Sequence, residues 1–393
     1  MIIMISGWIP LPEQDAEKNG EFRYHRFAVV IPAHNEEKVI RSMVESLKRQ
    51  QYPKDLFDIY VICDNCSDNT GYEAKKAGTR VLVRNNENER GKGYALDWAF
   101  ARIFALNEQY DAVCVFDADN VVSGTYLLEM NRMLNNGHEV IQGYIDSKNP
   151  FDSWISLSYS IAFWLSNRIF QQTRYNLGLS CGLCGTGFCI RTSVLRELGW
   201  GATCLTEDLE FTMKLILNNR KVAFCKKAVV YDEKPLTFIQ SWRQRKRWMQ
   251  GHTDCAKRYL AKLLKKSFTE ANLIAFDGCI YLILPIHFIF FGLAVLISWS
   301  ESAFPSMPFY IIGYSFPSEV WSLIVLVQIS FGPLVVLFDK KWDIRILAGF
   351  IFYPFYCLTW LPVTIAGIKD SGKKEWVHTT HTRNIPIEDI EGS

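Results

Sequence analysis

Three short motifs along this chain carry residue types that could act together on a phosphorylated substrate. They are Asp117-Ala118-Asp119, then Thr206-Glu207-Asp208, then Gln244-Arg245-Lys246-Arg247-Trp248. The first two supply carboxylates, which bind metal ions and accept protons, and the third joins guanidinium groups to an aromatic ring. Each motif has an ordinary structural interpretation on its own, so their order and surroundings decide how they are interpreted.

The first motif follows Ala112–Phe116, an apolar run typical of a buried strand. Side chains two positions apart on a strand point to the same face, so Asp117 and Asp119 are expected to lie side by side. Two carboxylates can hold a hard cation such as Mg²⁺ or Mn²⁺. Such a cation bridges a diphosphate and stabilises it as a leaving group. A solvated loop is the competing interpretation.

The second motif lies at the start of a predicted helix, Leu209–Leu217. Carboxylates at a helix N-terminus often only cap the helix. The alternative is a general base that takes a proton from an acceptor hydroxyl, and Asp208, beside Glu207, is placed for that role.

The third motif combines a phosphate-binding residue type with a sugar-binding one. Arginine donates paired hydrogen bonds to phosphate, as Arg247 would, and Trp248 offers a flat face to a sugar ring. The competing interpretation is a basic face that meets anionic lipid headgroups. Both can hold, because the motif and its flanks carry more cations than one diphosphate needs.

The first part of the chain alternates between apolar strand-like runs and amphipathic helical stretches. The predicted strands are 27–31, 59–63, 80–83 and 112–116, and the predicted helices are 36–50, 71–77 and 93–106. This alternation predicts an α/β fold with a mostly parallel sheet covered by helices on both faces. Each strand ends in a polar cluster, and ligands bind at that edge in such folds.

Three long apolar segments follow, each long enough to cross a bilayer: Gly278–Trp299, Val320–Phe338 and Ile346–Ile368. The basic stretch Arg243–Lys266 precedes them, which favours the cytoplasmic side for the preceding domain. Three crossings would place the basic tail outside. The third segment could instead be re-entrant or broken at Pro354 and Pro362, or a fourth short segment could lie within Phe304–Phe316.

Composition excludes some classes of partner and cofactor. The 393 residues carry a net charge of +2, and the basic stretch adjoins the apolar segments, which argues against a nucleic-acid partner. The 11 cysteines are scattered through a domain expected to be cytosolic, so we expect no structural disulfides. Two C-x-x-C pairs, Cys63/Cys66 and Cys181/Cys184, have the spacing of zinc ligands, but we favour buried thiols because both pairs lie within other motifs.

The order D-x-D, T-E-D and Q-x-x-R-W before apolar segments resembles the family 2 glycosyltransferases. Within that family it is most similar to the processive group of cellulose, chitin, hyaluronan and poly-N-acetylglucosamine synthases. The resemblance covers residues 25–270 by motif. It implies a GT-A fold, which is a Rossmann-like nucleotide-sugar-binding domain, and a single displacement that inverts the anomeric carbon.

The resemblance also implies a role for residues in each motif. Asp117 and Asp119 would hold Mg²⁺ or Mn²⁺, and Asp208 would be the base. The implied contacts to the nucleotide-sugar are Ala33, Glu36, Asp64, Lys92, Asp117, Gln244, Arg247 and Trp248, and those to the acceptor are Gly185, Thr186 and Trp248. The family's D-D-x-S-x-D pattern reads Asp64-Asn65-Cys66-Ser67-Asp68-Asn69 here, and no N-terminal membrane segment is evident.

These features predict five parts of the chain: an N-terminal segment (1–24), a GT-A domain (25–235), an amphipathic interface segment (236–277), about three transmembrane helices (278–368) and a tail (369–393). The predicted enzyme is a hexosyltransferase of the cell membrane, multi-pass, with a cytoplasmic catalytic domain. It would move a sugar from UDP-glucose or UDP-N-acetylglucosamine to a growing β-linked glycan.

Two alternatives for the function remain open. One is transfer of a single sugar to a polyprenyl phosphate or another lipid. The other is a non-catalytic membrane subunit of a polysaccharide export system. The small apolar region also leaves open a homo-oligomer or an export partner, because three segments are fewer than a polymer channel needs.

Overall fold

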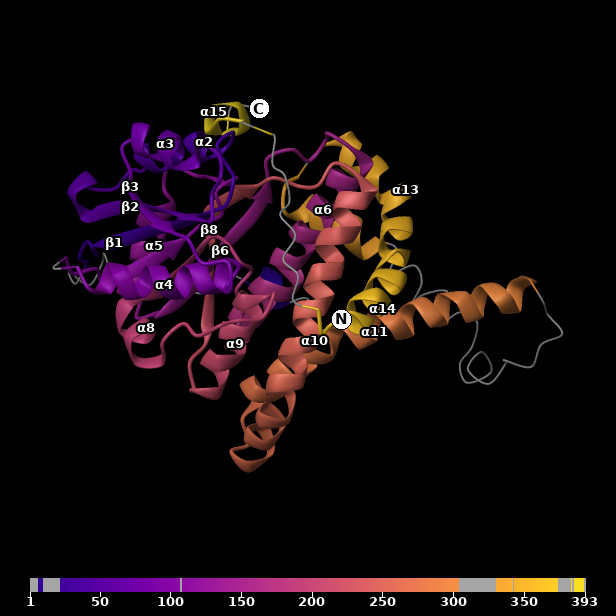
Figure 1. Cartoon of the computed structure of the whole chain (residues 1–393). Coiled ribbons are helices and arrows are strands. Elements are labelled where there is room, and N and C mark those ends of the chain that lie inside the picture. The colour runs from indigo at the N-terminus through magenta and orange to yellow at the C-terminus, as the bar shows by residue number, and fades with distance from the viewer. Residues whose placement is uncertain are drawn as a thin grey trace.

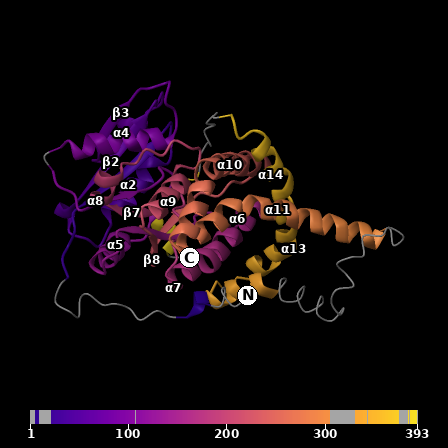
Figure 2. The same ribbon diagram turned by 90° about the horizontal axis from the view of Figure 1, so that it is seen from below.

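The computed structural model describes residues 6–9, 22–106, 108–303, 330–341, 343–373, 383 and 385–391. An α/β domain occupies one side of the molecule, and the long helix α10 (Phe238–Thr269) connects it to a group of C-terminal helices (Figure 1). Seen from below, α10 lies with α11 (Leu273–Ala303), α13 (Ile344–Leu358) and α14 (Trp360–Lys369) at one side of the sheet (Figure 2).

The α/β domain is built on one sheet of eight strands in the order β3-β2-β1-β4-β7-β6-β8-β5. The strands are β1 (Phe27–Ala33), β2 (Phe57–Asp64), β3 (Arg80–Arg84), β4 (Ala112–Val115), β5 (Val121–Val122), β6 (Val140–Ser147), β7 (Phe188–Arg191) and β8 (Val222–Asp232). The pairs β1–β2, β2–β3 and β1–β4 are parallel, as the sequence predicts.

The second half of the sheet is mixed, so the expectation of a mostly parallel sheet is wrong there. Strand β7 is antiparallel to both β4 and β6, and β5 is antiparallel to β8. The cause is the turn before β7. The N–H of Gly187 donates to the carbonyl of Val115, so β7 begins where β4 ends and must run back along it. The apolar period of a strand does not encode its direction.

Both faces of the sheet are covered, which explains why the central strands β1 and β4 are apolar throughout. In β1, Phe27, Val29 and Ile31 enter one core, whereas Ala28 and Val30 enter the other. Helices α2 (Ile40–Lys48), α3 (Thr70–Lys76) and α5 (Tyr126–Asn135) contribute to the first core. Helices α4 (Lys92–Phe104), α6 (Trp154–Leu165), α8 (Thr192–Leu198) and α9 (Glu207–Leu217) contribute to the second.

The third apolar segment of the sequence lies along the α/β domain and α10. A Cβ on Gly349 of α13 would lie 2.6 Å from the side chain of Leu157 in α6. A Cβ on Gly367 of α14 would lie 2.4 Å from the side chain of Met249 in α10. The helix is broken at Thr359, between α13 and α14. The other face of α13 and α14 is apolar and exposed, and its residues are Ile344, Leu347, Ile351, Phe352, Phe355, Leu358 and Ile365.

By length and composition, Leu273–Phe290 and Ile344–Lys369 are the two helices of the described chain that could cross a membrane. Only 28% and 22% of these stretches are buried, unlike the core helix of a soluble protein. The predicted segment Val320–Phe338 is described only from residue 330, and Phe304–Phe316 lies outside the described residues.

The turn that follows the helical residues 330–338 is fixed to the α/β domain by a buried ion pair. Asp339 pairs with Arg168 of the π-helical stretch η3 (Ser166–Gln172), and their side chains are 4% and 10% exposed. Lys226 lies 3.2 Å from the same carboxylate. Removing one partner of a buried pair leaves the other charge uncompensated.

Asp339→Asn is therefore expected to lower the free energy of unfolding by about 3 kcal/mol. Asp343→Asn is a matched control, because Asp343 pairs with the exposed Arg345 on the other side of the same turn. Its effect should be small, since exposed pairs contribute little. Thermal unfolding of both variants in the same detergent would check this, and equal losses would contradict the role given to Asp339.

Candidate active site

A pocket of about 430 Å³ opens at the carboxyl ends of β1, β2 and β4. It brings together all the residues that the sequence predicts for the site: Ala33, Glu36, Asp64, Lys92, Asp117, Asp119, Gly185, Thr186, Glu207, Asp208, Gln244, Arg247 and Trp248. These residues come from loops and helices spread over more than half of the chain. Their individual roles stay predictions, and their geometry is described below.

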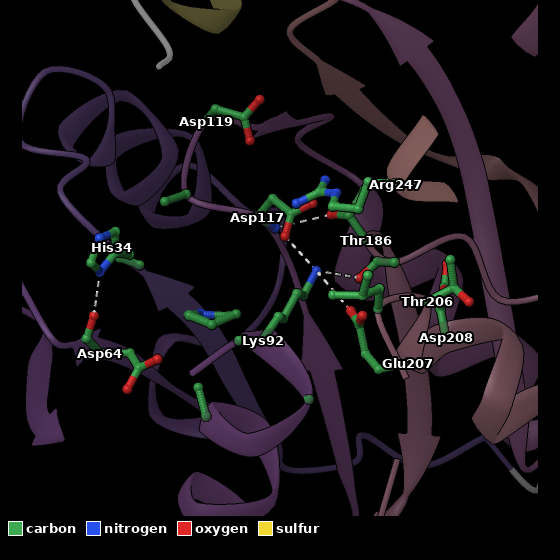
Figure 3. A pocket seen from close by; sticks show the side chains of 18 of the residues that line it. His34, Asp64, Lys92, Asp117, Asp119, Thr186, Thr206, Glu207, Asp208 and Arg247 are labelled. Atoms are coloured by element: carbon green, nitrogen blue, oxygen red, sulfur yellow. Dashed lines mark hydrogen bonds and ion pairs between the residues drawn. The ribbon is translucent and has the colours of Figure 1, made fainter. Parts of the chain in front are cut away.

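Lys92, the first residue of α4, places its ammonium group among acids at the centre of the pocket (Figure 3). It pairs with Asp117, lies 3.9 Å from Glu207 and donates to the carbonyl oxygen of Gly185 at 2.7 Å. Burial lowers the pKa of Lys92, but the charges of Asp117, Glu207 and Asp208 outweigh burial and raise it. Lys92 is therefore a fixed positive charge.

Glu207 and Asp208 occupy the first turn of α9. Burial raises the pKa of Glu207 to about 7, an effect that Lys92 opposes and Asp208 reinforces. Burial also raises the pKa of Asp208, against the N–H of Leu209 and the charge of Lys92, which lower it. In Figure 3 a dashed line joins Glu207 to Lys92, and none joins Asp208 to Lys92. The two adjacent carboxyl groups therefore have different partners.

Asp117 and Asp119 lie in the turn after β4, which ends at Val115. The expectation that they share one face of a strand is therefore wrong. Asp117 contacts Lys92, whereas Asp119 is 6% exposed and accepts hydrogen bonds from Asn120 at 3.2 Å and from the N–H of Glu233 at 3.4 Å. Figure 3 shows the two carboxylates apart, although both line the pocket.

The turn 185–187 forms the wall between β4 and β7. Gly185 and Gly187 have φ angles of 79° and 61°, in the left-handed region that favours glycine. The hydroxyl of Thr186 accepts the N–H of Asp117 at 3.0 Å. A Cβ on Gly185 would lie 3.6 Å from the carboxylate of Asp208 and 3.9 Å from the ammonium of Lys92, so the bare backbone faces these two groups.

The side of the pocket formed by β1 and β2 holds a buried charge pair, Arg84 and Asp64. Asp64, the last residue of β2, accepts a hydrogen bond from Arg84 at 2.6 Å, and the ring of His34 contacts the carbonyl oxygen of Asp64 at 2.7 Å. Burial raises the pKa of Asp64, and Arg84 opposes this effect. Glu36 is anchored beside them by its N–H, which donates to Thr70 at 2.8 Å.

The residues of the basic motif on helix α10 contact two different parts of the molecule. Gln244 and Arg247 line the pocket. Arg245 is fully buried on another face, where it donates to Thr359 at 2.7 Å, at the break between α13 and α14. Lys246 pairs with Asp370, which follows α14. One arginine of the motif therefore serves the pocket, while its neighbours hold the C-terminal helices.

The pocket lining also includes residues outside the predicted motifs, among them Phe163 of α6, Asp232 at the end of β8, and Glu233. Burial raises the pKa of Asp232 to about 6, and Lys234, 2.6 Å away, opposes this effect. The ammonium of Lys234 lies 3.2 Å from the ring centroid of Phe163. The sequence signal that could have identified Asp232 and Glu233 is an acidic pair at the end of a strand. They were missed because β8 was not among the predicted strands.

A sheet of this order, with carboxylates gathered at the carboxyl ends of its first parallel strands, defines the class as a GT-A catalytic domain. Residues 25–251 match the sequence profile described as "Glycosyltransferase like family 2". The chain belongs to this family of glycosyltransferases. The family assigned from the three motifs is therefore confirmed, while membership of its processive group stays a prediction.

Three curated proteins illustrate the relationship. "Probable glycosyltransferase YdaM" of Bacillus subtilis is 29% identical over 68% of this chain and 64% of its own length. Beta-monoglucosyldiacylglycerol synthase of Trichormus variabilis is 29% identical over 57% of this chain and 48% of its own. Poly-beta-1,6-N-acetyl-D-glucosamine synthase of Staphylococcus epidermidis is 23% identical over 83% and 78%. The chain thus spans about half to two thirds of the first two relatives.

One solved structure is similar over nearly the whole chain. The mannosyltransferase PcManGT of Pyrobaculum calidifontis, in complex with GDP-Man and Mn²⁺, aligns with a TM-score of 0.62. The alignment covers 95% of this chain and 94% of that one at 16% identity, so it shows a shared fold.

Glu207 gives a pH-dependent prediction. Its pKa of about 7 in the folded protein lies above the usual 4.5, so folding favours the protonated form. Stability should fall as the pH rises from about 4.5 to about 7 and stay lower above that. Glu207→Gln cannot ionise, so its Tm should exceed that of the native chain by about 5 °C at pH 8 and match it near pH 4.5.

The control is Glu45→Gln, because Glu45 is an exposed residue of α2 paired with Arg41. Its Tm should follow the native chain at both pH values. A gain for Glu207→Gln that is the same at pH 8 and pH 4.5 would contradict the raised pKa.

Proposed function

We propose that this chain is an inverting hexosyltransferase that moves a sugar from a UDP-sugar to a hydroxyl group of a growing β-linked polysaccharide at a membrane. The observation that carries the proposal is the pocket itself. It gathers Asp117, Asp208 and Arg247 from three motifs, together with the half-buried Lys92. UDP-glucose and UDP-N-acetylglucosamine are the proposed donors.

On the donor side, Glu36 and Asp64 are proposed to contact the uracil and ribose, and Ala33 lines the same pocket. Among the described residues, no group of three or more His, Cys, Asp or Glu side chains is arranged to hold a metal ion. The carboxylates of Asp117 and Asp119 nevertheless fit Mg²⁺ or Mn²⁺, because both offer hard oxygen ligands and phosphate oxygens can complete the shell. When bound, such a cation would neutralise the diphosphate.

The transfer step is proposed to use Asp208 as the base. The acceptor hydroxyl oxygen forms a bond to the anomeric carbon of the donor as the bond from that carbon to the diphosphate oxygen breaks. The hydroxyl proton passes to the carboxylate of Asp208, and UDP leaves with the bonding electrons. Lys92 and Arg247, which both line the pocket, are proposed to stabilise the charge that develops on the diphosphate.

The acceptor is proposed to lie against Trp248 and the turn at Gly185 and Thr186. The ring centroid of Trp248 lies 6.0 Å from that of Tyr159 and 6.4 Å from that of Phe163, and this packing fixes the plane of the Trp248 ring. A rigid aromatic face suits successive sugar rings. Similarity to the poly-beta-1,6-N-acetyl-D-glucosamine synthase over most of both chains supports a polymer as acceptor.

A lipid acceptor is the second candidate. It is favoured by the higher identity to beta-monoglucosyldiacylglycerol synthase, although that match spans about half of the relative. The third candidate, a non-catalytic subunit, is disfavoured by the presence of carboxylates at positions 117, 119 and 208.

A membrane location is proposed from the apolar surface of α11, α13 and α14. Phe290 of α11, Ile351 and Phe355 of α13 are each more than 60% exposed, although they are large and apolar. Basic residues flank α13 and α14 on both sides, at Arg345 and Lys369. If both flanks face one anionic leaflet, α13 and α14 lie along the membrane, and the catalytic domain stays on the cytoplasmic side.

Asp208→Asn tests the proposed base. Amide nitrogen cannot accept the proton, so we expect kcat for transfer to fall by about 10³-fold or more. Binding of UDP with Mn²⁺, measured by calorimetry, should stay close to native because Asp208 is assigned no contact to UDP. Asp111→Asn is the control, since Asp111 pairs with Arg23 outside the pocket. Retained transfer in Asp208→Asn would remove Asp208 as the base.

Product length distinguishes the acceptors. With UDP-N-acetylglucosamine or UDP-glucose, we expect a ladder of products on a gel, and Trp248→Ala should shorten that ladder because the aromatic face is lost. Trp98→Ala, on α4 outside the pocket, should leave the ladder native. A single product with the mobility of a glycolipid would contradict the polymer and support the lipid acceptor.

A further inference from the structure

A buried carboxylate outside the pocket, that of Glu210, holds the segment that leads into the second motif. Glu210 lies in the first turn of α9, and its side chain is 4% exposed. One of its carboxylate oxygens accepts the N–H groups of Thr203 at 2.6 Å and Cys204 at 2.8 Å. Both of these residues line the pocket, and Asp208 follows them along the chain.

The other oxygen of Glu210 is bound by α10. Arg258 donates to it at 3.0 Å, and the hydroxyl of Tyr259 lies 3.4 Å from it. The same nitrogen of Arg258 donates to the hydroxyl of Thr203 at 3.1 Å, and Asp254 fixes the rest of the guanidinium with contacts of 3.0 and 2.6 Å. Helices α9 and α10 therefore hold the same short segment through one ion pair.

Two glycines confine this segment from either side. A Cβ on Gly93 would overlap the carbonyl oxygen of Ala202, and a Cβ on Gly251 would lie 2.6 Å from the hydroxyl oxygen of Thr206 and 2.7 Å from its backbone nitrogen. Gly93 follows Lys92 in α4, and Gly251 lies about one turn after Trp248 in α10. The position of residues 202–206 thus sets the spacing between both helices and the start of α9.

We propose that Glu210 is a positioning residue for transfer: bound by Arg258, it holds residues 203–206 so that Asp208 faces the pocket in register with Lys92 and α10. This role rests on the proposed function. A displacement of about 1 Å at a reacting group can lower a rate on the order of 100-fold. A guanidinium and two backbone N–H groups hold the carboxylate of Glu210 in one geometry. These hydrogen bonds are strong because the acceptor is charged, so the charge of Glu210 matters as well as its volume.

The test compares Glu210→Gln with Glu129→Gln in the full chain. Glu129 is also buried and ion-paired, with Arg132 at 2.5 Å, but it lies on α5 away from the pocket. We expect Glu210→Gln to lower kcat about tenfold or more. It should leave the Kd for UDP with Mn²⁺ unchanged and shift the acidic limb of the kcat–pH profile. Glu129→Gln should change none of these.

If Glu210→Gln lowers only the Tm, as Glu129→Gln would, Glu210 is structural and the proposal is overturned. Arg258→Lys covers the case in which Glu210→Gln does not fold, because it keeps the charge and loses the planar fork. It should lower kcat with little change in Tm, and a native kcat would overturn the proposal.

A double variant tests whether the two residues act as a pair. Each single variant leaves one member of the ion pair without its counterpart. The double variant Glu210→Gln with Arg258→Met should therefore lose less of kcat than the two single losses multiplied together. Multiplicative losses would overturn the coupling. A native chain that transfers from no UDP-sugar would overturn the proposed function before any variant is made, so the two failures are distinguishable.

Discussion

The arrangement of the site depends on the contacts of the half-buried ammonium group of Lys92. This group joins the turn after β4 through Asp117, the turn before β7 through the carbonyl of Gly185, and the start of α9 through Glu207. Without this cation, Asp117, Glu207 and Asp208 would repel one another in a pocket partly shielded from water. Burial is the main reason that the pKa of Glu207 stays raised in spite of Lys92, and the charges of Asp208 and Asp117 add to the effect of burial.

The fold brings these segments within reach of Lys92 through close backbone contacts. A side chain would push the segments apart at three glycines. Gly93 brings α4 against residue 202, Gly187 lies against the side chain of Val230 in β8, and Gly251 brings α10 against Thr206. Helix α10 contacts both the α/β domain and the C-terminal helices. Arg247 lines the pocket, and Arg245 is buried against the break between α13 and α14. The site and the apolar surface are thus parts of one packed unit.

Much of the site could be predicted from sequence, because residue type and strand ends are local properties. All thirteen predicted residues line the pocket, and the parallel half of the sheet was predicted correctly. The reversal at β7 was not, since it depends on a long-range bond between Gly187 and Val115. The separate directions of Asp117 and Asp119 were not predicted either, because they follow from where β4 ends. The contacts of Glu210 were also not predicted, because Arg258 lies far from it along the chain.

The most direct test of the central claim is to measure UDP release by the purified native chain with a panel of UDP-sugars, with and without Mg²⁺ or Mn²⁺, and to digest the product with anomer-specific glycosidases. The proposed function predicts release of UDP that depends on the metal and on one hexose donor, with a product that β-specific enzymes cleave. UDP release from no donor, or a product cleaved only by α-specific enzymes, would contradict it.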